Sequence, residues 1–468
     1  MHRRQFLSLL AGSALAQPSF SPPNIVLILA DDLGATDLGC YGSDLHETPR
    51  IDRISRQSLR FSHALSPAPV CSPTRAAMLT GKHPARLGIT IWHEGAVTPP
   101  TNQRLLPATS EPNLPHTETT LAEVLQQAGY STALVGKWHL GDAAHHPETQ
   151  GFEVNIGGTH WGAPPTYFYP YSGPFGSQKE LRYVPSLTPG AEGEYLTDRL
   201  TTEALRVIDA FHARQKPFFL YLAHHAPHTP IEAKPALVAK YEAKIPKGVN
   251  HTNAKYAAMV ESLDQSVGRV LDHLRIRGLD RNTIFIVTSD NGGFLQSGNG
   301  PRITSNAPLR SGKGSLYEGG IRVPLIINWP GVTPAGAVSA EPVVLTDLFP
   351  TLCAAAKAPV PAGATDGLDL LPVLRNPATR LPREAIPFHY PHYYPTTTPV
   401  SAIRTRDWKL LEYFEDDHVE LYNLAQDPSE KTDLAGKNPA KAKALREQLH
   451  AWRQSVGARL PTPNPKKE

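Results

Sequence analysis

The residues best suited to chemistry begin in the stretch Cys71-Ser-Pro-Thr-Arg75. Ser72 is a good helix N-cap, Pro73 suits the first helical turn, and Gly81 can end the helix. This predicts a helix with Cys71 just before its N-terminus, where free amide donors and the helix dipole favour a negative charge. Arg75 adds a positive charge in the first turn. The pattern indicates an anion site beside a reactive cysteine; a buried thiol before an ordinary helix is the alternative.

Oxygen-bearing side chains follow two apolar segments that lie far apart in the sequence. Residues 24–30 end in Asp31-Asp32, and residues 283–289 end in Asp290-Asn291. Short, continuously apolar runs are typical of central parallel strands, whose carboxyl ends form the ligand-binding edge of an open α/β sheet. Carboxylate and amide oxygens favour calcium or magnesium over zinc. For either pair alone, a role in turns and helix caps is the alternative.

Basic side chains form a second group with the same placement. Lys137 and His139 follow one predicted buried strand, and His228 follows another. Together with Arg75 and Lys313, they would stabilise an anionic transition state if they were held rigidly and shielded from water. Two neighbouring histidines, His224 and His225, remain alternatives to His228.

Strand and helix patterns alternate along most of the chain, which predicts an α/β fold with a large doubly wound mixed sheet flanked by helices. The expected strands cover residues 24–30, 131–135, 217–223, 283–289 and 321–329, and the expected helices 120–128, 197–213 and 256–277. The composition changes near 335–385, where proline, alanine and glycine are frequent. Beyond it, segments 386–390, 402–414 and 419–424 and a helix at 439–456 predict a small antiparallel sheet with one helix. The expected domains are residues 22–375 and 385–460.

The N-terminus combines a twin arginine, Arg3-Arg4, with a short apolar run and the small-residue pattern Ala14-Leu15-Ala16. This predicts an export signal over residues 1–16, of the twin-arginine type, and a periplasmic or secreted mature protein. An amphipathic tail is the alternative. The apolar run is too short to span a bilayer and no other span is evident, so no transmembrane anchor is expected.

The composition is that of a globular protein, with 468 residues, 40% hydrophobic and 19% charged, and a net charge of +3. No run of lysine or arginine indicates a nucleic-acid partner. The three cysteines, Cys40, Cys71 and Cys353, are too few for a disulfide framework. A single Cys40–Cys353 bridge remains open.

These motifs together resemble the type I sulfatase family of the alkaline phosphatase superfamily. The resemblance covers nearly the whole mature chain, in order: Asp31-Asp32-Leu-Gly34, Thr48-Pro-Arg-Ile-Asp-Arg53, Cys71-Ser-Pro-Thr-Arg75 with Thr80-Gly81, Gly136-Lys-Trp-His-Leu-Gly141, Pro217-Phe-Phe-Leu-Tyr221 with His228, Ser289-Asp-Asn-Gly-Gly293, Gly312-Lys-Gly-Ser-Leu-Tyr-Glu-Gly-Gly320, and Glu420-Leu-Tyr-Asn-Leu424 with Asp427-Pro428. It implies an exported bacterial sulfatase with an alkaline phosphatase-like fold.

The resemblance also implies that a separate formylglycine-forming enzyme oxidises Cys71 to an aldehyde. A thiol attacking a sulfate ester would leave a stable sulfur-bound product. A hydrated aldehyde offers two hydroxyls, of which one attacks sulfur and the other later expels sulfate. This divides one difficult step into two easier ones.

The family's site residues carry over to matching positions of this chain. The resemblance implies one calcium ion, bound by Asp31, Asp32, Asp290, Asn291 and the modified Cys71. It also implies that Arg75 positions the hydrated aldehyde and that Lys137 and Lys313 bind sulfate oxygens. His139 would act as the base when the sulfated form breaks down. His228 would protonate the departing alcohol, since histidine titrates near neutrality.

The implied function is hydrolysis of sulfate esters on sulfated carbohydrates. A phosphonate or phosphate-ester hydrolase of the same superfamily is one alternative, because sulfate and phosphate are similar tetrahedral anions. A non-catalytic sulfoglycan-binding protein, with Cys71 never matured, is another. Aromatic residues could stack on a sugar or only pack their loops. They are Trp161, Tyr167, Phe168 and Tyr169, with His389, His392, Tyr393 and Tyr394 in the smaller domain.

Overall fold

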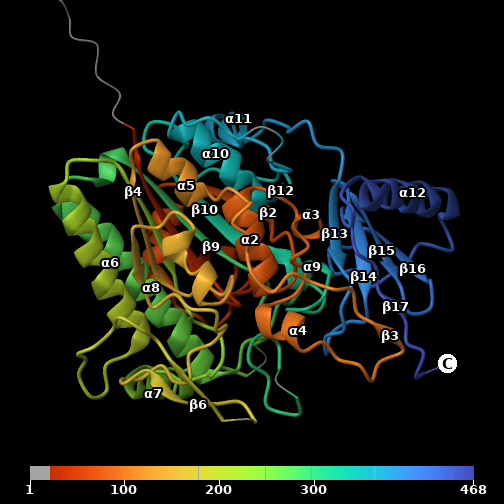
Figure 1. Cartoon of the computed structure of the whole chain (residues 1–468), viewed down its shortest axis with the longest axis horizontal. Helices are drawn as coiled ribbons and strands as arrows, with labels where there is room; N and C mark the ends of the chain where they lie inside the picture. Colours follow the sequence, from red (N-terminus) through yellow and green to blue (C-terminus); the bar gives the residue numbers. More distant parts are fainter. Residues whose placement is uncertain are drawn as a thin grey trace, which may run out of the picture.

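A nine-stranded mixed sheet runs through the centre of the molecule (Figure 1). The computed structural model describes residues 22–467 except 178, 248, 297, 362 and 364, so the predicted export signal lies outside the described residues. The strands are, in sheet order, β11 (Val338–Ser339), β2 (Leu59–Leu65), β10 (Arg322–Asn328), β9 (Thr283–Ser289), β1 (Asn24–Ala30), β8 (Phe218–Ala223), β4 (Ser131–Gly136) and β5 (Val154–Ile156), with β12 (Val343–Val344) also paired to β2.

The pairing confirms the predicted mixed α/β sheet. Strands β9, β1, β8, β4 and β5 are parallel to one another, whereas β10 is antiparallel to both β9 and β2. The sequence analysis did not predict β2. Its polar residues Arg60, Ser62 and His63 interrupt the apolar run, because this strand is only partly buried.

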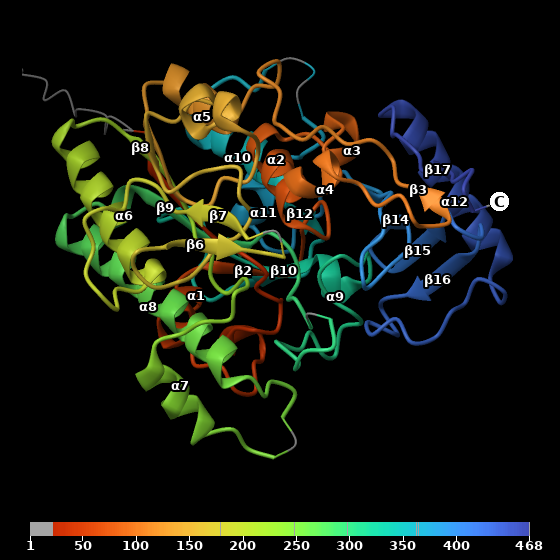
Figure 2. The ribbon, with the colours of Figure 1, turned by 60° about the horizontal axis from the view of Figure 1, so that its bottom comes forward.

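Helices cover both faces of the sheet (Figure 2). Strand β1 shows why its sequence is continuously apolar: Ile25, Leu27 and Leu29 enter one hydrophobic core, while Val26, Ile28 and Ala30 enter the other. The first core is closed by α2 (Cys71–Thr80), α5 (Leu121–Gln127), α10 (Leu348–Ala355) and α11 (Leu371–Arg375). The second is closed by α1 (Pro49–Ser55), α6 (Leu196–Ala213), α7 (Pro235–Glu242) and α8 (Ala254–Ile276).

A four-stranded antiparallel sheet with helix α12 (Pro439–Ser455) lies beside the main sheet (Figure 1). Its strands are β13 (Ile386–Tyr390), β14 (Val400–Arg404), β15 (Trp408–Tyr413) and β16 (Val419–Asn423). The prediction of one segment over 402–414 is wrong. A tight turn separates β14 from β15, in which the Trp408 amide donates to Thr405 Oγ1 at 3.0 Å. The shorter elements are α3 (Pro84–Leu87), α4 (His93–Val97), α9 (Glu318–Ile321), the pair β3 (Leu105–Leu106) and β17 (Thr462–Pro463), and the hairpin β6 (Ser172–Phe175) and β7 (Glu180–Tyr183).

Helix α2 differs from the prediction at its start. It begins at Cys71 itself with Val70 as N-cap, so Ser72 is not the capping residue. The Ser72 hydroxyl instead donates to the main-chain oxygen of His139 at 2.7 Å. Gly81 ends the helix as predicted, in the left-handed region with φ of 70°. Cys71 therefore occupies the first turn of α2.

The cysteines do not form a bridge. Cys40, Cys71 and Cys353 are free. Cys353 lies in the core under α2, whereas Cys40 packs against the core on the other face of the sheet, so the sheet separates them.

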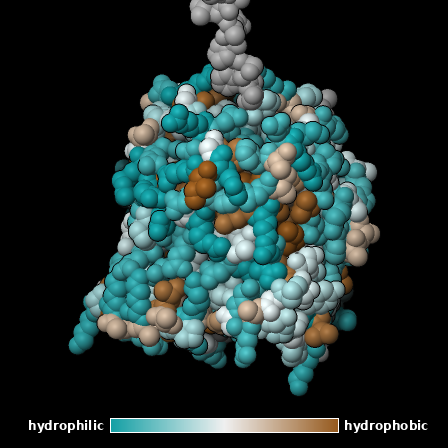
Figure 3. All heavy atoms as spheres, turned by 90° about the vertical axis from the view of Figure 1, so that its left-hand side faces the viewer, coloured by the Kyte–Doolittle hydropathy of each residue, from teal (hydrophilic) through white to brown (hydrophobic). Residues whose placement is uncertain are grey.

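Among the residues that the structure describes, no helix combines the length and the apolar character needed to cross a membrane. The face shown in Figure 3 is covered mainly by hydrophilic side chains, with hydrophobic ones in small groups.

A buried ion-pair network joins the small sheet to the main domain. Glu318 in α9 is fully buried and accepts hydrogen bonds from Arg322, from Arg404 at 3.0 Å and from Lys409 at 3.2 Å. Burial alone would raise the pKa of Glu318, but the three cations, Arg404 first, hold it well below its usual range. The network holds α9, which follows the loop that carries Lys313.

We expect Glu318→Gln to lower the free energy of unfolding by about 3–5 kcal/mol, because it leaves buried cations uncompensated. Denaturant unfolding of the purified variants measures this. Glu447→Gln is the control, since its pair with Lys443 is exposed and 3.9 Å long, and should shift stability by less than about 0.5 kcal/mol. Equal shifts in the two variants would contradict the assigned role.

Candidate active site

The strand register brings the predicted site residues to one edge of the sheet. Ala30 pairs with Ser289, so Asp31 and Asp290, the next residues, lie side by side. Gly136 pairs with Ala223 of β8, which places Lys137 at the same edge. Gly136 has φ of 106°, and a Cβ there would lie 2.0 Å from a main-chain oxygen, so this close crossing requires glycine.

Cys71 lies above this edge, at the start of α2. Its side chain donates to Asp31 Oδ1 at 3.3 Å, and Lys313 Nζ lies 3.5 Å from the sulfur. Burial, and then the negative charge of Asp31, raise the pKa of the Cys71 thiol. As a plain cysteine it is therefore a protonated thiol and a poor nucleophile at neutral pH.

Each of the three carboxylates at the edge has its own buried cation. Lys137 Nζ lies 2.7 Å from Asp31, Arg75 NH2 2.8 Å from Asp290, and Lys313 Nζ 2.8 Å from Asp32. Burial raises the pKa of Asp31, but Lys137, His228 and Arg75 together lower it to about 2. The charges balance without any ion, so a divalent cation would leave positive charge for an anionic ligand to neutralise.

Asn291 supplies the observation that fits a metal ion. Its side-chain amide donates to Asp32 Oδ1 at 2.8 Å and to the Gly292 oxygen at 2.9 Å, which fixes the side chain's orientation. Its Oδ1 is buried and has no hydrogen-bond partner among the described residues. An unpartnered oxygen beside three carboxylates is a hard-donor arrangement of the kind that binds calcium or magnesium. Ligand atoms of Asp31, Asp32, Cys71 and His228 also lie within 4.8 Å of one another.

The histidines separate into two sets. His139 and His228 line the cavity above Cys71, and His228 Nε2 lies 3.5 Å from Asp32. His224 points elsewhere, since its Nε2 contacts Ser266 of α8 at 2.8 Å. His225 is buried and does not line the cavity. The structure therefore favours His228 among the three alternatives.

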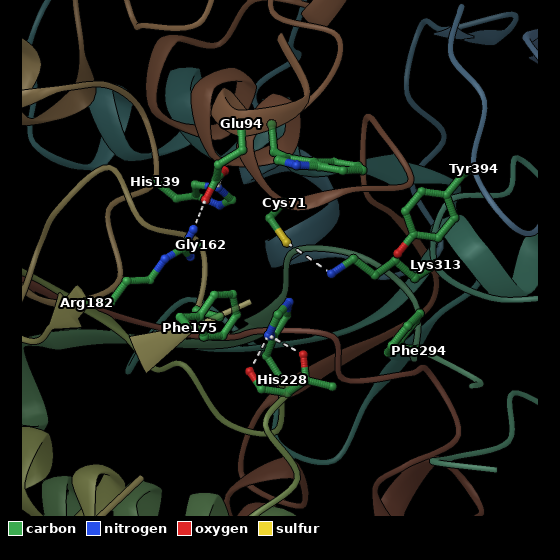
Figure 4. Close-up of a pocket in the computed structure, with 13 residues that line it drawn as sticks. Cys71, Glu94, His139, Gly162, Phe175, Arg182, His228, Phe294, Lys313 and Tyr394 are labelled. Carbon is green, nitrogen blue, oxygen red and sulfur yellow. Dashed lines mark hydrogen bonds and ion pairs between the residues drawn. The ribbon is translucent and has the colours of Figure 1, made fainter. Parts of the chain in front are cut away.

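The cavity has a volume of about 360 Å³ and Cys71 at its floor (Figure 4). Sequence reasoning missed most of its wall, which belongs to no motif. These residues are Trp92, Glu94, Gly162, Ala163, Phe175, Arg182, Thr229 and Phe294. Glu94 comes from α4 and Arg182 from the β6–β7 hairpin, so only packing of distant loops brings them here.

The aromatic candidates from the sequence have mixed placements. Tyr394 lines the cavity. Tyr167 is buried and its hydroxyl donates to the main-chain oxygens of His225 and His228, so it holds the histidine loop. The others lie outside the cavity lining: Trp161 donates to Glu180, His389 and His392 are buried in contact with Ser401 and Thr90, Tyr393 donates to Glu415, and Phe168 and Tyr169 pack against Tyr195 and Tyr171.

Comparison with known proteins agrees with this geometry. The family model described as Sulfatase matches residues 23–358, and that for the C-terminal part of N-sulphoglucosamine sulphohydrolase matches residues 312–455. A sulfatase of Formosa agariphila is 35% identical over 95% of this chain and 91% of its own, and human arylsulfatase A is 34% identical over 95% and 90%. Rat N-acetylgalactosamine-6-sulfatase is 37% identical over 77% and 67%.

Solved structures show the same fold. The structure of Ps i-CgsB, also solved in complex with a neocarrahexaose, is 32% identical with a TM-score of 0.75, covering 92% of this chain and 93% of its own. The phosphonate monoester hydrolase of Agrobacterium radiobacter has a TM-score of 0.64 at 19% identity, over 93% of this chain and 96% of its own. The fold alone therefore does not separate the two reactions.

The chain belongs to the sulfatase family. Its activity is the hydrolysis of sulfuric esters.

We expect the unmodified Cys71 thiol to be alkylated by iodoacetamide at least about tenfold more slowly than a free thiol at pH 8, because its raised pKa and burial leave little accessible thiolate. Peptide mass spectrometry over time measures the labelling. Labelling in denaturant is the control, where all three cysteines should react quickly. Labelling of folded protein at the rate of a free thiol would contradict this environment.

Proposed function

We propose that this protein removes sulfate from sulfated carbohydrates, using a formylglycine formed from Cys71 and one bound calcium ion. The observation that carries this proposal is that three compensated carboxylates and the unpartnered Asn291 oxygen converge at the sheet edge next to Cys71, which lines the cavity. A separate maturation enzyme supplies the oxidation, which the buried and protonated Cys71 thiol could not achieve alone.

Asp31, Asp32, Asp290 and Asn291, with the oxidised residue 71, hold the calcium ion in this proposal. The ion supplies positive charge next to the sulfate group, and the aldehyde supplies a hydroxyl nucleophile in its hydrated form. Calcium is a hard cation that prefers oxygen ligands, which matches the donor set.

The basic residues act on the sulfate and on protons. Lys313 lines the cavity, and Lys137 is a fully buried cation paired with Asp31 beside Cys71; in this proposal both bind sulfate oxygens. Arg75 is held between Asp290 and the Lys137 oxygen, so its guanidinium is rigid when it positions residue 71. His139 takes a proton from residue 71. His228 lines the cavity, and its Nδ1 donates to the Thr229 oxygen at 2.8 Å. The proton that it gives to the departing alcohol is therefore the Nε2 hydrogen of its imidazolium form.

A carbohydrate substrate fits the cavity wall. The volume of about 360 Å³ is near the lower end for small-molecule sites and suits one sugar ring with its sulfate. Phe175 and Tyr394 offer apolar ring faces, while Arg182 offers polar atoms to hydroxyls. The sugar in the name of the N-acetylgalactosamine-6-sulfatases supports the same class.

We also propose that the protein is exported from the cytoplasm. The twin arginine and apolar run of residues 1–16 support secretion or a periplasmic location for the mature chain. The domain division at residues 22–375 and 385–460 is likewise a proposal, supported by the separate hydrophobic clusters of the small sheet.

We expect Cys71→Ala to abolish hydrolysis of a panel of sulfated mono- and oligosaccharides while its circular dichroism and melting temperature stay near those of the wild type, because it removes the nucleophile alone. Sulfate release measures the activity. The wild type should also act on sulfate esters much faster than on matched phosphate esters. Appreciable activity in Cys71→Ala would refute the assigned nucleophile, and faster phosphate release would favour the phosphoesterase alternative.

We expect chelation of divalent metal to stop turnover and lower the melting temperature, and calcium to restore both. Calcium at a hundred times its dissociation constant should stabilise the fold by about 2.7 kcal/mol. Asn291→Ala should reduce this calcium-dependent shift, whereas Asp272→Asn, which alters a surface ion pair, should retain it. Restoration by zinc and not by calcium would disprove the hard-donor argument.

A further inference from the structure

We propose that Glu94 is a positioning residue for His139: its carboxylate holds the imidazole in the tautomer that carries hydrogen on Nε2, which leaves the Nδ1 lone pair as the base. This inference rests on the proposed role of His139. It assigns a function to a residue outside the family motifs quoted above.

The contact itself is direct. Glu94 Oε2 lies 3.1 Å from His139 Nε2, and His139 is buried. The other ring nitrogen, Nδ1, is buried without any hydrogen-bond partner among the described residues. A buried polar atom without a partner is costly unless a ligand or reacting group meets it. The two nitrogens of His139 therefore have distinct surroundings.

The protonation states decide which nitrogen carries hydrogen. Burial, and next the charge of Lys137, lower the pKa of His139 to about 4, so the ring is neutral at neutral pH. Burial raises the pKa of Glu94, but His139 and Arg182 hold it well below its usual range, so Glu94 is ionised. An ionised carboxylate can only accept a hydrogen bond. A neutral ring has one N–H, which must then be on Nε2.

The main chain of His139 and the other edge of its ring are also held in place. His139 has φ of 61°, and its main-chain oxygen accepts from Ser72 at 2.7 Å. A Cβ on Gly162 would lie 2.3 Å from Cε1 of the imidazole, so the glycine backbone packs against the ring. The ring has little freedom to turn over and exchange its two nitrogens.

Glu94 is itself fixed from the opposite side. Arg182 NH2 lies 3.3 Å from Glu94 Oε1, and Arg182 Nε lies 2.8 Å from Glu180. The guanidinium also stacks over Phe175, 4.2 Å from the ring centroid. Figure 4 shows Glu94 between His139 and Arg182. One Glu94 oxygen thus serves the histidine and the other serves the arginine.

The same arrangement stabilises the ring after it has accepted a proton. When Nδ1 takes the proton of a hydroxyl on residue 71, the oxygen keeps the bonding electron pair and the ring becomes an imidazolium. Lys137 and Arg75 oppose that charge, whereas Glu94 favours it. The Nε2 hydrogen stays on the ring throughout, so Glu94 acts through His139 and does not take the proton.

The test is Glu94→Gln in the full-length matured enzyme. A glutamine amide can donate or accept, so it no longer selects one tautomer. We expect kcat to fall on the order of tenfold to a hundredfold with little change in KM, within the range that positioned general bases contribute. The acidic limb of the pH profile should move to lower pH, because the loss of the carboxylate lowers the pKa of His139. Nitrogen-15 NMR of labelled histidine should show the Nε2–H tautomer of His139 in the wild type and its loss in the variant.

Matched variants separate positioning from folding. Glu180→Gln removes another carboxylate from Arg182 without touching His139, and should leave kcat and the tautomer near the wild-type values. Glu94→Asp should recover part of the activity. Gly162→Ala, which displaces the ring from its other side, should reduce kcat in a protein that still binds calcium.

Two results would overturn the inference: an unchanged kcat and pH profile in Glu94→Gln, or an Nδ1–H tautomer in the wild type. Either can be found while the wild type hydrolyses sulfate esters normally. If the wild type released no sulfate at all, the proposed function would fail instead, and the NMR spectrum would still decide the tautomer.

Discussion

The site depends on a balance of buried charge at the edge of the main sheet. Three carboxylates that end strands β1 and β9 would repel one another strongly in a dry interior. Lys137, Arg75 and Lys313 each neutralise one of them, and they come from three separate parts of the chain. Since each cation is paired, an added metal ion makes the floor positive, which suits a sulfate group.

That balance constrains the elements around it. Helix α2 must start close enough to the edge for Cys71 and Arg75 to reach the carboxylates. Ser72 contributes by tying the helix start to the main chain of His139. The small sheet contributes through Arg404 and Lys409, which donate to Glu318 of α9, the helix that follows the loop carrying Lys313. The small sheet thus supports the site from a distance.

The two histidines differ in what surrounds them. His139 is enclosed by Glu94 and Gly162 and is buried, whereas His228 is partly exposed to the cavity and lies near Asp32 and Lys313. Similar side chains thereby receive different protonation chemistry. The proposed division into a base and an acid thus rests on the environment of each ring and not on the residue type.

The strands that end at the site, the cysteine helix and the family could be predicted from the amino-acid sequence alone. The strands and the helix have local signals in the sequence, namely the continuously apolar residues of β1 and β9 and Gly81 at the end of α2. Prediction from the sequence failed where the local signal was weak, as in the partly polar strand β2 and the turn between β14 and β15.

Which side chains contact one another could not be predicted before the three-dimensional packing was known. Glu94 and Arg182 lie in segments without a motif, and Ser72 bonds to His139 instead of capping its own helix. Of the three clustered histidines, only the packing of their loop sends His228 into the cavity. Periodic burial and helix capping depend on residues that are close in the sequence, so the sequence reveals them. A contact between two loops depends on how the whole core positions those loops.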